Sequence, residues 1–132
     1  MHTNSENPAL YSSLSLALVG DAVYELFIRT RLLKKSGAHA HTLHKRAIAF
    51  VKAGGQAESM LSILEFLSEK ETEVYKRGRN AKSPTVPKNA DLTQYRIATG
   101  FEALLGYLYL DGQTGRLNEI MDMAYDVIDK KI

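Results

Sequence analysis

Two carboxylates placed inside apolar stretches are the residues of this sequence whose positions could do chemistry. Asp21 lies in the largely apolar stretch 18–25, and Glu102 lies in a second such stretch, 100–111. An ionised carboxylate that is buried without a partner is very costly, so such a group is usually paired, protonated or bound to a metal. Two acids from distant parts of the chain therefore predict a site at which they converge on one cation.

Magnesium is the cation that this pair of oxygen ligands suits. Mg²⁺ commonly uses one or two protein carboxylates, keeps several waters and takes its other ligands from substrate phosphate. Under this hypothesis Asp21 and Glu102 hold Mg²⁺ and are the catalytic residues, and a water on the metal attacks a phosphodiester. The spacing is also compatible with acids that are satisfied by backbone donors, by Arg29 or Arg96, or by a partner chain.

The elements that must position these acids read as helices throughout, which predicts an all-α fold with a single domain over residues 1–132. Serine and aspartate caps and glycine breaks set the boundaries. The expected helices cover about 12–35, 41–53, 56–67, 68–77, 91–110 and 117–130, with caps at Ser12 or Ser13, Ser68 and Asp91 and breaks at Gly37, Gly54-Gly55 and Gly78.

The spacing of apolar residues on the first helix predicts the face that it buries. We expect its inward flank to hold Leu14, Leu18, Ala22 and Leu26, with Val19, Val23 and Phe27 beside them.

A glycine accompanies each acid within its helix. Gly20 lies beside Asp21, and Gly106 lies one turn beyond Glu102. Glycine inside a helix costs about 1 kcal/mol relative to alanine, so we expect compensation. A close approach of the two helices would supply it and would bring the two carboxylates together.

Basic residues crowd one stretch of a chain whose net charge is only +2. Pro84 and Pro87 punctuate this acid-free stretch, which predicts a flexible basic loop over about 78–90. A local basic patch suits contact with a polyanion, although many such loops are only solvated. The residues proposed to contact a polyanion are Lys76, Arg77, Arg79, Asn80, Lys82 and Lys88, with Lys45 and Arg46 as a weaker second patch.

Composition excludes several other classes of protein. The chain has no cysteine, so neither a disulfide framework nor a thiolate zinc site is available. The first residues lack the basic and apolar blocks of a signal peptide, and no stretch is long and uncharged enough to span a bilayer. We therefore expect a cytoplasmic protein with no membrane partner.

The two acid-bearing motifs resemble those of the ribonuclease III catalytic domain. The stretch Val-Gly-Asp-Ala-Val at 19–23 is similar to that family's signature Leu-Gly-Asp-Ala-Val, and Glu-Ala-Leu-Leu-Gly at 102–106 with Tyr-Leu-Asp at 109–111 is similar to its later motif. The resemblance extends over the whole chain and is greatest to the short branch called Mini-III. Stretches 43–47, 51–57 and 76–82 also resemble that branch, which lacks a double-stranded-RNA-binding domain.

The resemblance implies a ribonuclease III endonuclease-domain helical bundle that forms a homodimer. It implies magnesium-dependent cleavage of double-stranded RNA that leaves 5′-phosphate and 3′-hydroxyl ends. For the short branch it implies maturation of the large-subunit (23S) ribosomal RNA precursor.

The sequence departs from the family at the further acids that the longer enzymes carry in both motifs. Leu14, Ala17 and Thr99 occupy the matching positions. Glu25, one turn beyond Asp21, is either a substitute ligand or a helix charge that faces solvent or a partner. The missing acids keep open a catalytically silent RNA-binding module, and a helical dimerisation adaptor is a further alternative.

Overall fold

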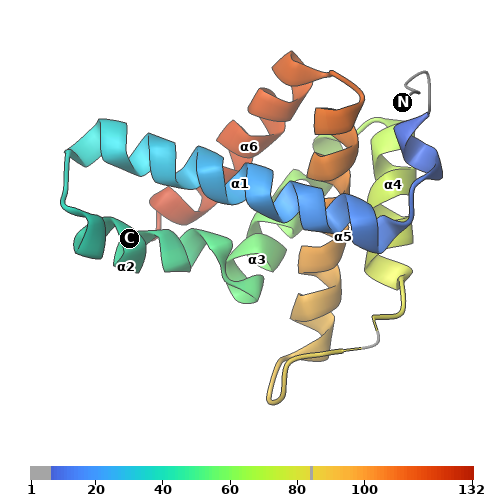
Figure 1. Ribbon diagram of the computed structural model, residues 1–132, viewed down its shortest axis with the longest axis horizontal. Helices are drawn as coiled ribbons and strands as arrows, with labels where there is room; N and C mark the ends of the chain where they lie inside the picture. The colour runs from blue at the N-terminus through green and yellow to red at the C-terminus, as the bar shows by residue number, and fades with distance from the viewer. Residues whose placement is uncertain (1–6, 84) are drawn as a thin grey trace, which may run out of the picture.

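The computed structural model describes residues 7–83 and 85–132, and these residues fold into helices with no strand. The predicted all-α class is therefore confirmed (Figure 1). The elements are η1 (Pro8–Leu10), α1 (Ser13–Ser36), α2 (Ala40–Val51), α3 (Ala53–Ile63), η2 (Leu64–Phe66), α4 (Glu69–Asn80), α5 (Leu92–Leu110) and α6 (Thr114–Asp129). No helix in the described ranges is long and apolar enough to cross a membrane.

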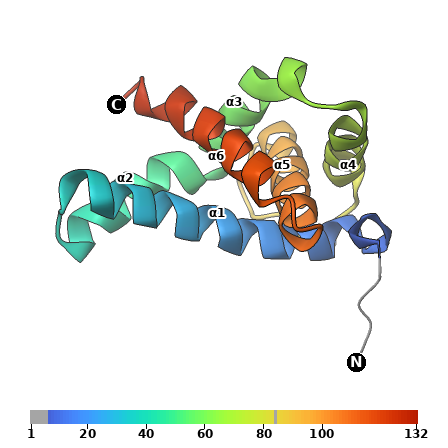
Figure 2. The same ribbon diagram turned by 90° about the horizontal axis from the view of Figure 1, so that it is seen from above.

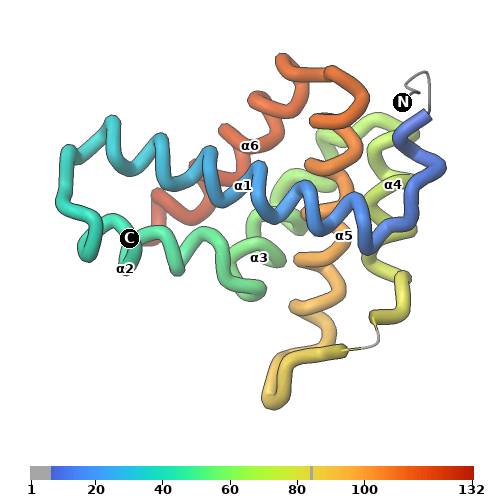
Figure 3. The backbone as a smooth tube through the Cα atoms, viewed as in Figure 1, coloured from blue at the N-terminus to red at the C-terminus, as the bar shows by residue number. Residues whose placement is uncertain are grey.

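Helix α5 is the centre of the bundle. It packs against α1, α3, α4 and α6, and Figure 2 looks almost along its axis with these helices around it. Helix α2 doubles back along α1, and α3 then leads the chain behind α5 toward α4 (Figure 3). Because α5 carries Glu102, this acid is held by the most enclosed element of the fold.

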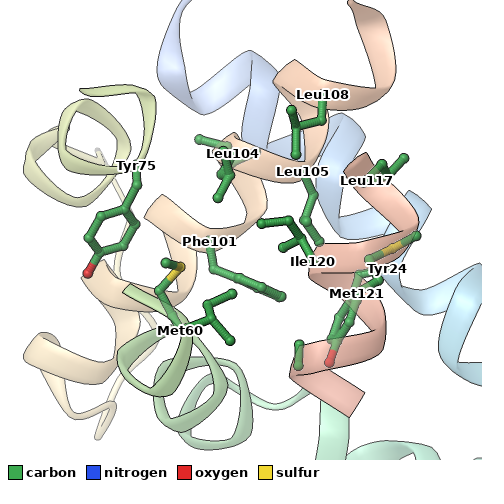
Figure 4. Packing of buried hydrophobic residues seen from close by; sticks show 14 of the residues in the cluster. Tyr24, Met60, Tyr75, Phe101, Leu104, Leu105, Leu108, Leu117, Ile120 and Met121 are labelled. Carbon is green, nitrogen blue, oxygen red and sulfur yellow. The ribbon is translucent and has the colours of Figure 1, made fainter. Parts of the chain in front are cut away.

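The core is built from the apolar face of every helix around α5. Figure 4 shows Phe101, Leu104 and Leu105 of α5 among side chains from α1, α3 and α6. The Tyr24 ring meets the Phe101 ring edge-on, with 5.0 Å between the ring centroids. Burial of these side chains stabilises the fold roughly in proportion to the apolar area removed from water.

The predicted helix caps are confirmed. Ser12 accepts from the Ser15 N–H, and Gly37 ends α1 with a φ of 64°, the left-handed conformation that suits glycine. Ser68 and Glu71 form a reciprocal capping box at the start of α4. Asp91 accepts from the backbone N–H of the third residue of α5.

Several predicted boundaries are wrong, and in two cases the reason is packing. The break between α2 and α3 falls at Lys52, whereas Gly54 and Gly55 lie inside α3. A Cβ on Gly55 would lie 2.2 Å from the Ala49 carbonyl oxygen, so this glycine permits a close contact. Gly78 likewise lies within α4 rather than ending it, pressed against α5. Helix α6 begins at Thr114, three residues earlier than expected. Pro84, one of the two prolines expected in the basic loop, lies outside the described residues.

The expected inward flank of α1 is also wrong, although Val23 and Phe27, expected beside it, are partly buried against the core. Leu18 and Leu26 are 76% and 69% exposed. The face of α1 that is buried against α5 and α2 instead carries Leu16, Ala17, Gly20, Tyr24, Ile28 and Leu32. Helix α1 therefore has a second apolar face that the described residues do not cover.

The close approach of α1 and α5 that the glycines predicted is present. A Cβ on Gly20 would lie 1.8 Å from the carbonyl oxygen of Glu102, and a Cβ on Gly106 would lie 1.9 Å from that of Leu16. Each glycine thus faces the backbone of the opposite helix. No side chain fits between the two helices at this crossing.

Replacing Gly20 with alanine is expected to separate these helices. A methyl group would clash with backbone that cannot rotate away, so Gly20→Ala should lower the free energy of unfolding by about 3 kcal/mol or more. Gly115→Ala is the matched control, because Gly115 lies in α6 and a Cβ added there would have nothing within 4 Å. The control should be neutral or more stable by up to about 1 kcal/mol. Urea unfolding followed by circular dichroism measures both, and an equal effect of the two substitutions would contradict the argument.

Candidate active site

The crossing of α1 and α5 brings Asp21 and Glu102 together. Gly20, the residue before Asp21, packs against the backbone of Glu102. The carboxyl groups of Asp21 and Glu102 lie within hydrogen-bonding reach of each other. Both side chains are half-buried. The two acids therefore share one small, partly enclosed site, as a jointly held cation would require.

The Glu102 carboxyl is strongly perturbed by this environment. Burial, followed by a hydrogen bond with Asp21, raises the pKa of Glu102 from 4.5 to about 8. The negative charges of Asp21 and Glu25 raise it further, whereas a hydrogen bond from Gln56 opposes the shift. Without a cation, Glu102 is thus protonated at neutral pH, and a bound cation would remove the reason for holding that proton.

Thr99, which occupies a position of a missing family acid, and Glu25, the possible substitute ligand, each have another hydrogen-bond partner. The Thr99 hydroxyl donates to the Tyr95 carbonyl oxygen at 2.9 Å. Glu25 accepts from Arg29, one turn along α1, at 2.8 Å. These contacts favour the interpretation of Glu25 as a helix charge with a partner, although its charge still reaches Glu102.

The donor set fits a hard divalent cation that keeps part of its water shell. Asp21 and Glu102 offer carboxylate oxygens, and a cation would offset the repulsion that arises when Glu102 is ionised beside Asp21. Within residues 7–83 and 85–132, no group of three or more histidine, aspartate or glutamate side chains is placed to hold a metal. Two carboxylates would leave the remaining coordination positions of such a cation open to water.

Gln56 is the residue at this site that the sequence analysis missed. Its amide nitrogen donates to Glu102 Oε2 at 3.1 Å, and its side chain is buried. The signal for it was present, because Gln56 precedes Met60 and Ile63 by four and seven residues on the buried stripe of α3. A polar residue on such a stripe needs a buried partner.

The predicted RNA-contacting residues lie on two surfaces. Lys76, Arg79 and Asn80 lie in the last turns of α4, and Lys82 and Lys88 lie in the following connection, residues 81–91. Lys45 and Arg46 are exposed on α2. In Figure 1 the start of α5 and the residues just before it lie below α1, and α2 lies below α1 on the left.

Arg77 is engaged in a structural contact. Its guanidinium donates to the carbonyl oxygens of Ala9 and Tyr11, both at 2.6 Å, and to Ser13 Oγ at 3.1 Å. These bonds tie α4 to residues 9–11 and to the first residue of α1. An additional contact of Arg77 with RNA stays a prediction.

The exposed apolar face of α1 continues onto α5 and α6. It lines an open groove of about 860 Å³. Leu18, Ala22 and Leu26 contribute from α1, with Tyr109 from α5 and Met121 from α6. Continuous apolar surface of this kind commonly marks a protein interface.

Comparison with known proteins identifies the family. The ribonuclease III domain matches residues 14–113, which include both acid-bearing helices. The chain belongs to the ribonuclease III family. Membership of this family makes the chain an endoribonuclease. Asp21 and Glu102 each lie in one of the two acid-bearing motifs, and the fold brings these two motifs into contact.

Relatives within the family match this chain over most of their length. The Mini-ribonuclease 3 of Thermoanaerobacter sp. (strain X514) is 49% identical over 119 residues, which are 90% of this chain and 84% of that protein. The Mini-ribonuclease 3 of Enterococcus faecalis is 50% identical over 113 residues, or 84% of this chain and 86% of the relative. A crystal structure of a Fusobacterium nucleatum protein superposes with a TM-score of 0.80 at 33% identity, covering 93% of this chain and 96% of that one. The resemblance to Mini-III and the expected ribonuclease III bundle are thus confirmed.

The raised pKa of Glu102 predicts how stability depends on pH when cations are removed. The folded protein holds the Glu102 proton up to about pH 8, whereas the unfolded chain releases it near pH 4.5. Stability should therefore fall as pH rises through this interval. In EDTA, Glu102→Gln should increase the free energy of unfolding by about 2–4 kcal/mol more at pH 9 than at pH 5.

The glutamine amide can accept from Gln56 and donate to Asp21, as a protonated glutamate does. Urea unfolding at the two pH values measures the effect, with Glu73→Gln on the exposed side of α4 as the control. The same gain at pH 5 and pH 9 would show that Glu102 does not titrate in this interval.

Proposed function

We propose that this chain is a magnesium-dependent endoribonuclease that cleaves double-stranded RNA and matures the ends of the 23S ribosomal RNA precursor in the cytoplasm. The observation that carries the proposal is the meeting of Asp21 and Glu102 at the α1–α5 crossing of a ribonuclease III domain. The ribosomal precursor is the substrate implied by the resemblance to the short branch of the family.

The roles of the two acids follow from their surroundings. Asp21 and Glu102 would hold Mg²⁺, which when bound supplies positive charge at the phosphate and activates water. The rigid crossing fixes both carboxylates before substrate arrives, so little reorganisation is needed at the moment of reaction. Water attacks phosphorus and the 3′ oxygen departs and takes up a proton, which leaves a 5′-phosphate and a 3′-hydroxyl.

Asp21→Asn is the direct test of the proposed activity. It should preserve the fold and duplex binding but lower cleavage at least 100-fold, because an amide is a poor ligand for Mg²⁺. The assay incubates a 23S precursor transcript with the protein, with and without Mg²⁺, and maps the RNA ends. Glu58→Gln, on the α3 surface, is the control.

Normal cleavage by Asp21→Asn would refute the assignment of Asp21. A wild-type protein that binds duplex RNA without cutting it would instead support the silent RNA-binding module. Cleavage of duplex RNA without trimming of the precursor would remove the proposed substrate but keep the proposed activity.

A duplex would be bound through the exposed cations of α4, residues 81–91 and α2. Double-stranded RNA is recognised mainly by its shape, phosphates and 2′-hydroxyls, which suits lysine and arginine side chains that carry no base specificity. The contacting residues proposed here are Lys76, Arg79, Asn80, Lys82, Lys88, Lys45 and Arg46, with Arg77, whose guanidinium already donates to the Ala9 carbonyl oxygen, as a further candidate.

The double variant Lys82→Ala/Lys88→Ala should weaken duplex binding and flatten its salt dependence. Each lost phosphate contact removes about one released counterion, so the slope of log K against log salt should fall in magnitude by about 1–2. Lys70→Ala, which removes an exposed cation from the other end of α4, should leave the slope unchanged. Fluorescence anisotropy with a duplex in EDTA measures all three proteins, and an unaltered slope in the double variant would argue against contact.

The groove on α1 is proposed to be covered by a second copy of this chain. The exposed apolar face is elongated along α1, and helices of this kind can pair about a two-fold axis through the same patch on each copy. Arg31 and Lys34 border the groove and supply a polar rim. The homodimer implied by the family resemblance thus has a surface suited to it.

Leu26→Glu should convert the dimer to a monomer. Placing a charge in the middle of an apolar interface leaves it desolvated and unpaired, which costs more than a surface substitution. Leu61→Glu is the matched control, because Leu61 is a similarly exposed leucine on α3 outside the groove. Sedimentation velocity at micromolar concentration distinguishes the species, and an unchanged sedimentation coefficient for Leu26→Glu would exclude this surface.

A further inference from the structure

Gln56 is the most deeply buried polar side chain next to the two acids. It lies one turn into α3, and only 1% of its surface is exposed. Its Nε2 donates one hydrogen to the carbonyl oxygen of Val51 at 2.8 Å and the other to Glu102 Oε2 at 3.1 Å. Both hydrogens of the amide nitrogen are therefore used.

The orientation of this amide is fixed by its two partners. The Val51 carbonyl oxygen can only accept a hydrogen bond, so a flipped amide would set two oxygens against each other. The same contact satisfies a carbonyl in the last turn of α2, where helix carbonyls lack partners within the helix. Gln56 therefore connects the end of α2 to the acid on α5.

The amide oxygen of Gln56 indicates that this side chain does more than fill space in the core. Its Oε1 is buried and has no hydrogen-bond partner among the described residues. A buried unpaired acceptor destabilises a protein, and an aliphatic side chain of similar size would avoid that cost. The amide is thus present for the hydrogens that it donates.

We infer that Gln56 is a positioning residue for the proposed reaction. By holding Oε2 of Glu102, it fixes the plane of the carboxylate, and the other carboxylate oxygen would be available to a cation that Asp21 also holds. A hydrogen bond from a neutral donor also favours the charged carboxylate that a metal needs. This inference rests on the proposed function, since it assigns Gln56 a part in the same metal site.

Gln56→Met tests the inference, because methionine has similar length but donates no hydrogen bond. Partners that orient a metal ligand typically change metal affinity or activity by 10–100-fold. We expect Gln56→Met to bind Mn²⁺ at least tenfold more weakly by electron paramagnetic resonance. The Mg²⁺ concentration for half-maximal duplex cleavage should rise by a similar factor, with much of the rate restored at saturating Mg²⁺.

Two further measurements separate positioning from structural damage. Duplex affinity in EDTA should stay within twofold of wild type, because Gln56 is buried and does not reach RNA. Ser59→Ala is the matched control, since Ser59 is a fully buried hydroxyl on the same helix that donates to the Ala124 carbonyl at 3.0 Å. It should leave the Mn²⁺ affinity and the Mg²⁺ dependence unchanged, even where it lowers the unfolding temperature.

Gln56→Asn provides a second variant, because its amide is one methylene too short to span both partners. It should show the same weakening of Mn²⁺ binding. An unaltered Mn²⁺ affinity in either folded variant of an active enzyme would overturn the role of Gln56 and leave the proposed function intact. Loss of cooperative unfolding in both variants would also overturn it, by making the amide purely structural. A wild-type protein that neither binds Mn²⁺ nor cleaves duplex RNA would overturn both proposals.

Discussion

The close contact between the backbones of α1 and α5 is the constraint on which the rest of the structure depends. Gly20 and Gly106 each lie so close to a backbone carbonyl of the opposite helix that a Cβ atom at either position would clash with it. This contact orients α5 across α1 and sets Glu102 beside Asp21 without relying on a flexible loop. The relative position of the two acids is thus set by the same helix crossing that brings core side chains together, since Tyr24 of α1 packs against Phe101 of α5 beside it.

The electrostatics of the site follow from this geometry. Two carboxylates that are forced together in a half-buried place cannot both be charged at low cost, and the raised pKa of Glu102 expresses that conflict. A protonated Glu102 carries no charge at neutral pH, so it does not stabilise the fold through an ion pair. The fold therefore accepts a local energetic cost at this crossing, as is common where a site is prepared for a ligand.

Local signals in the sequence predicted much of this fold, and long-range packing explains what they missed. Ser12, Gly37 and the Ser68–Glu71 capping box act within one turn, so their helix boundaries were correct. Gly55 and Gly78 look like helix breakers in sequence, but each lies inside a helix because another backbone packs against it. The two acids were proposed as site residues from their apolar surroundings. The contacts of Gln56 with Val51 and Glu102 could not be predicted, because they join residues from three helices.

The two apolar faces of α1 explain why its burial could not be predicted from spacing alone. A residue every 100° around the helix places Gly20 and Tyr24 toward α5, Leu18 and Ala22 on the exposed side, and Asp21 on the border between the two faces. A partner that covered the exposed face would therefore lie directly beside the acids. Such a partner would shield one edge of the site from water, which strengthens electrostatic interactions there. Binding of a second copy and binding of a cation would thus both involve the part of α1 around Asp21.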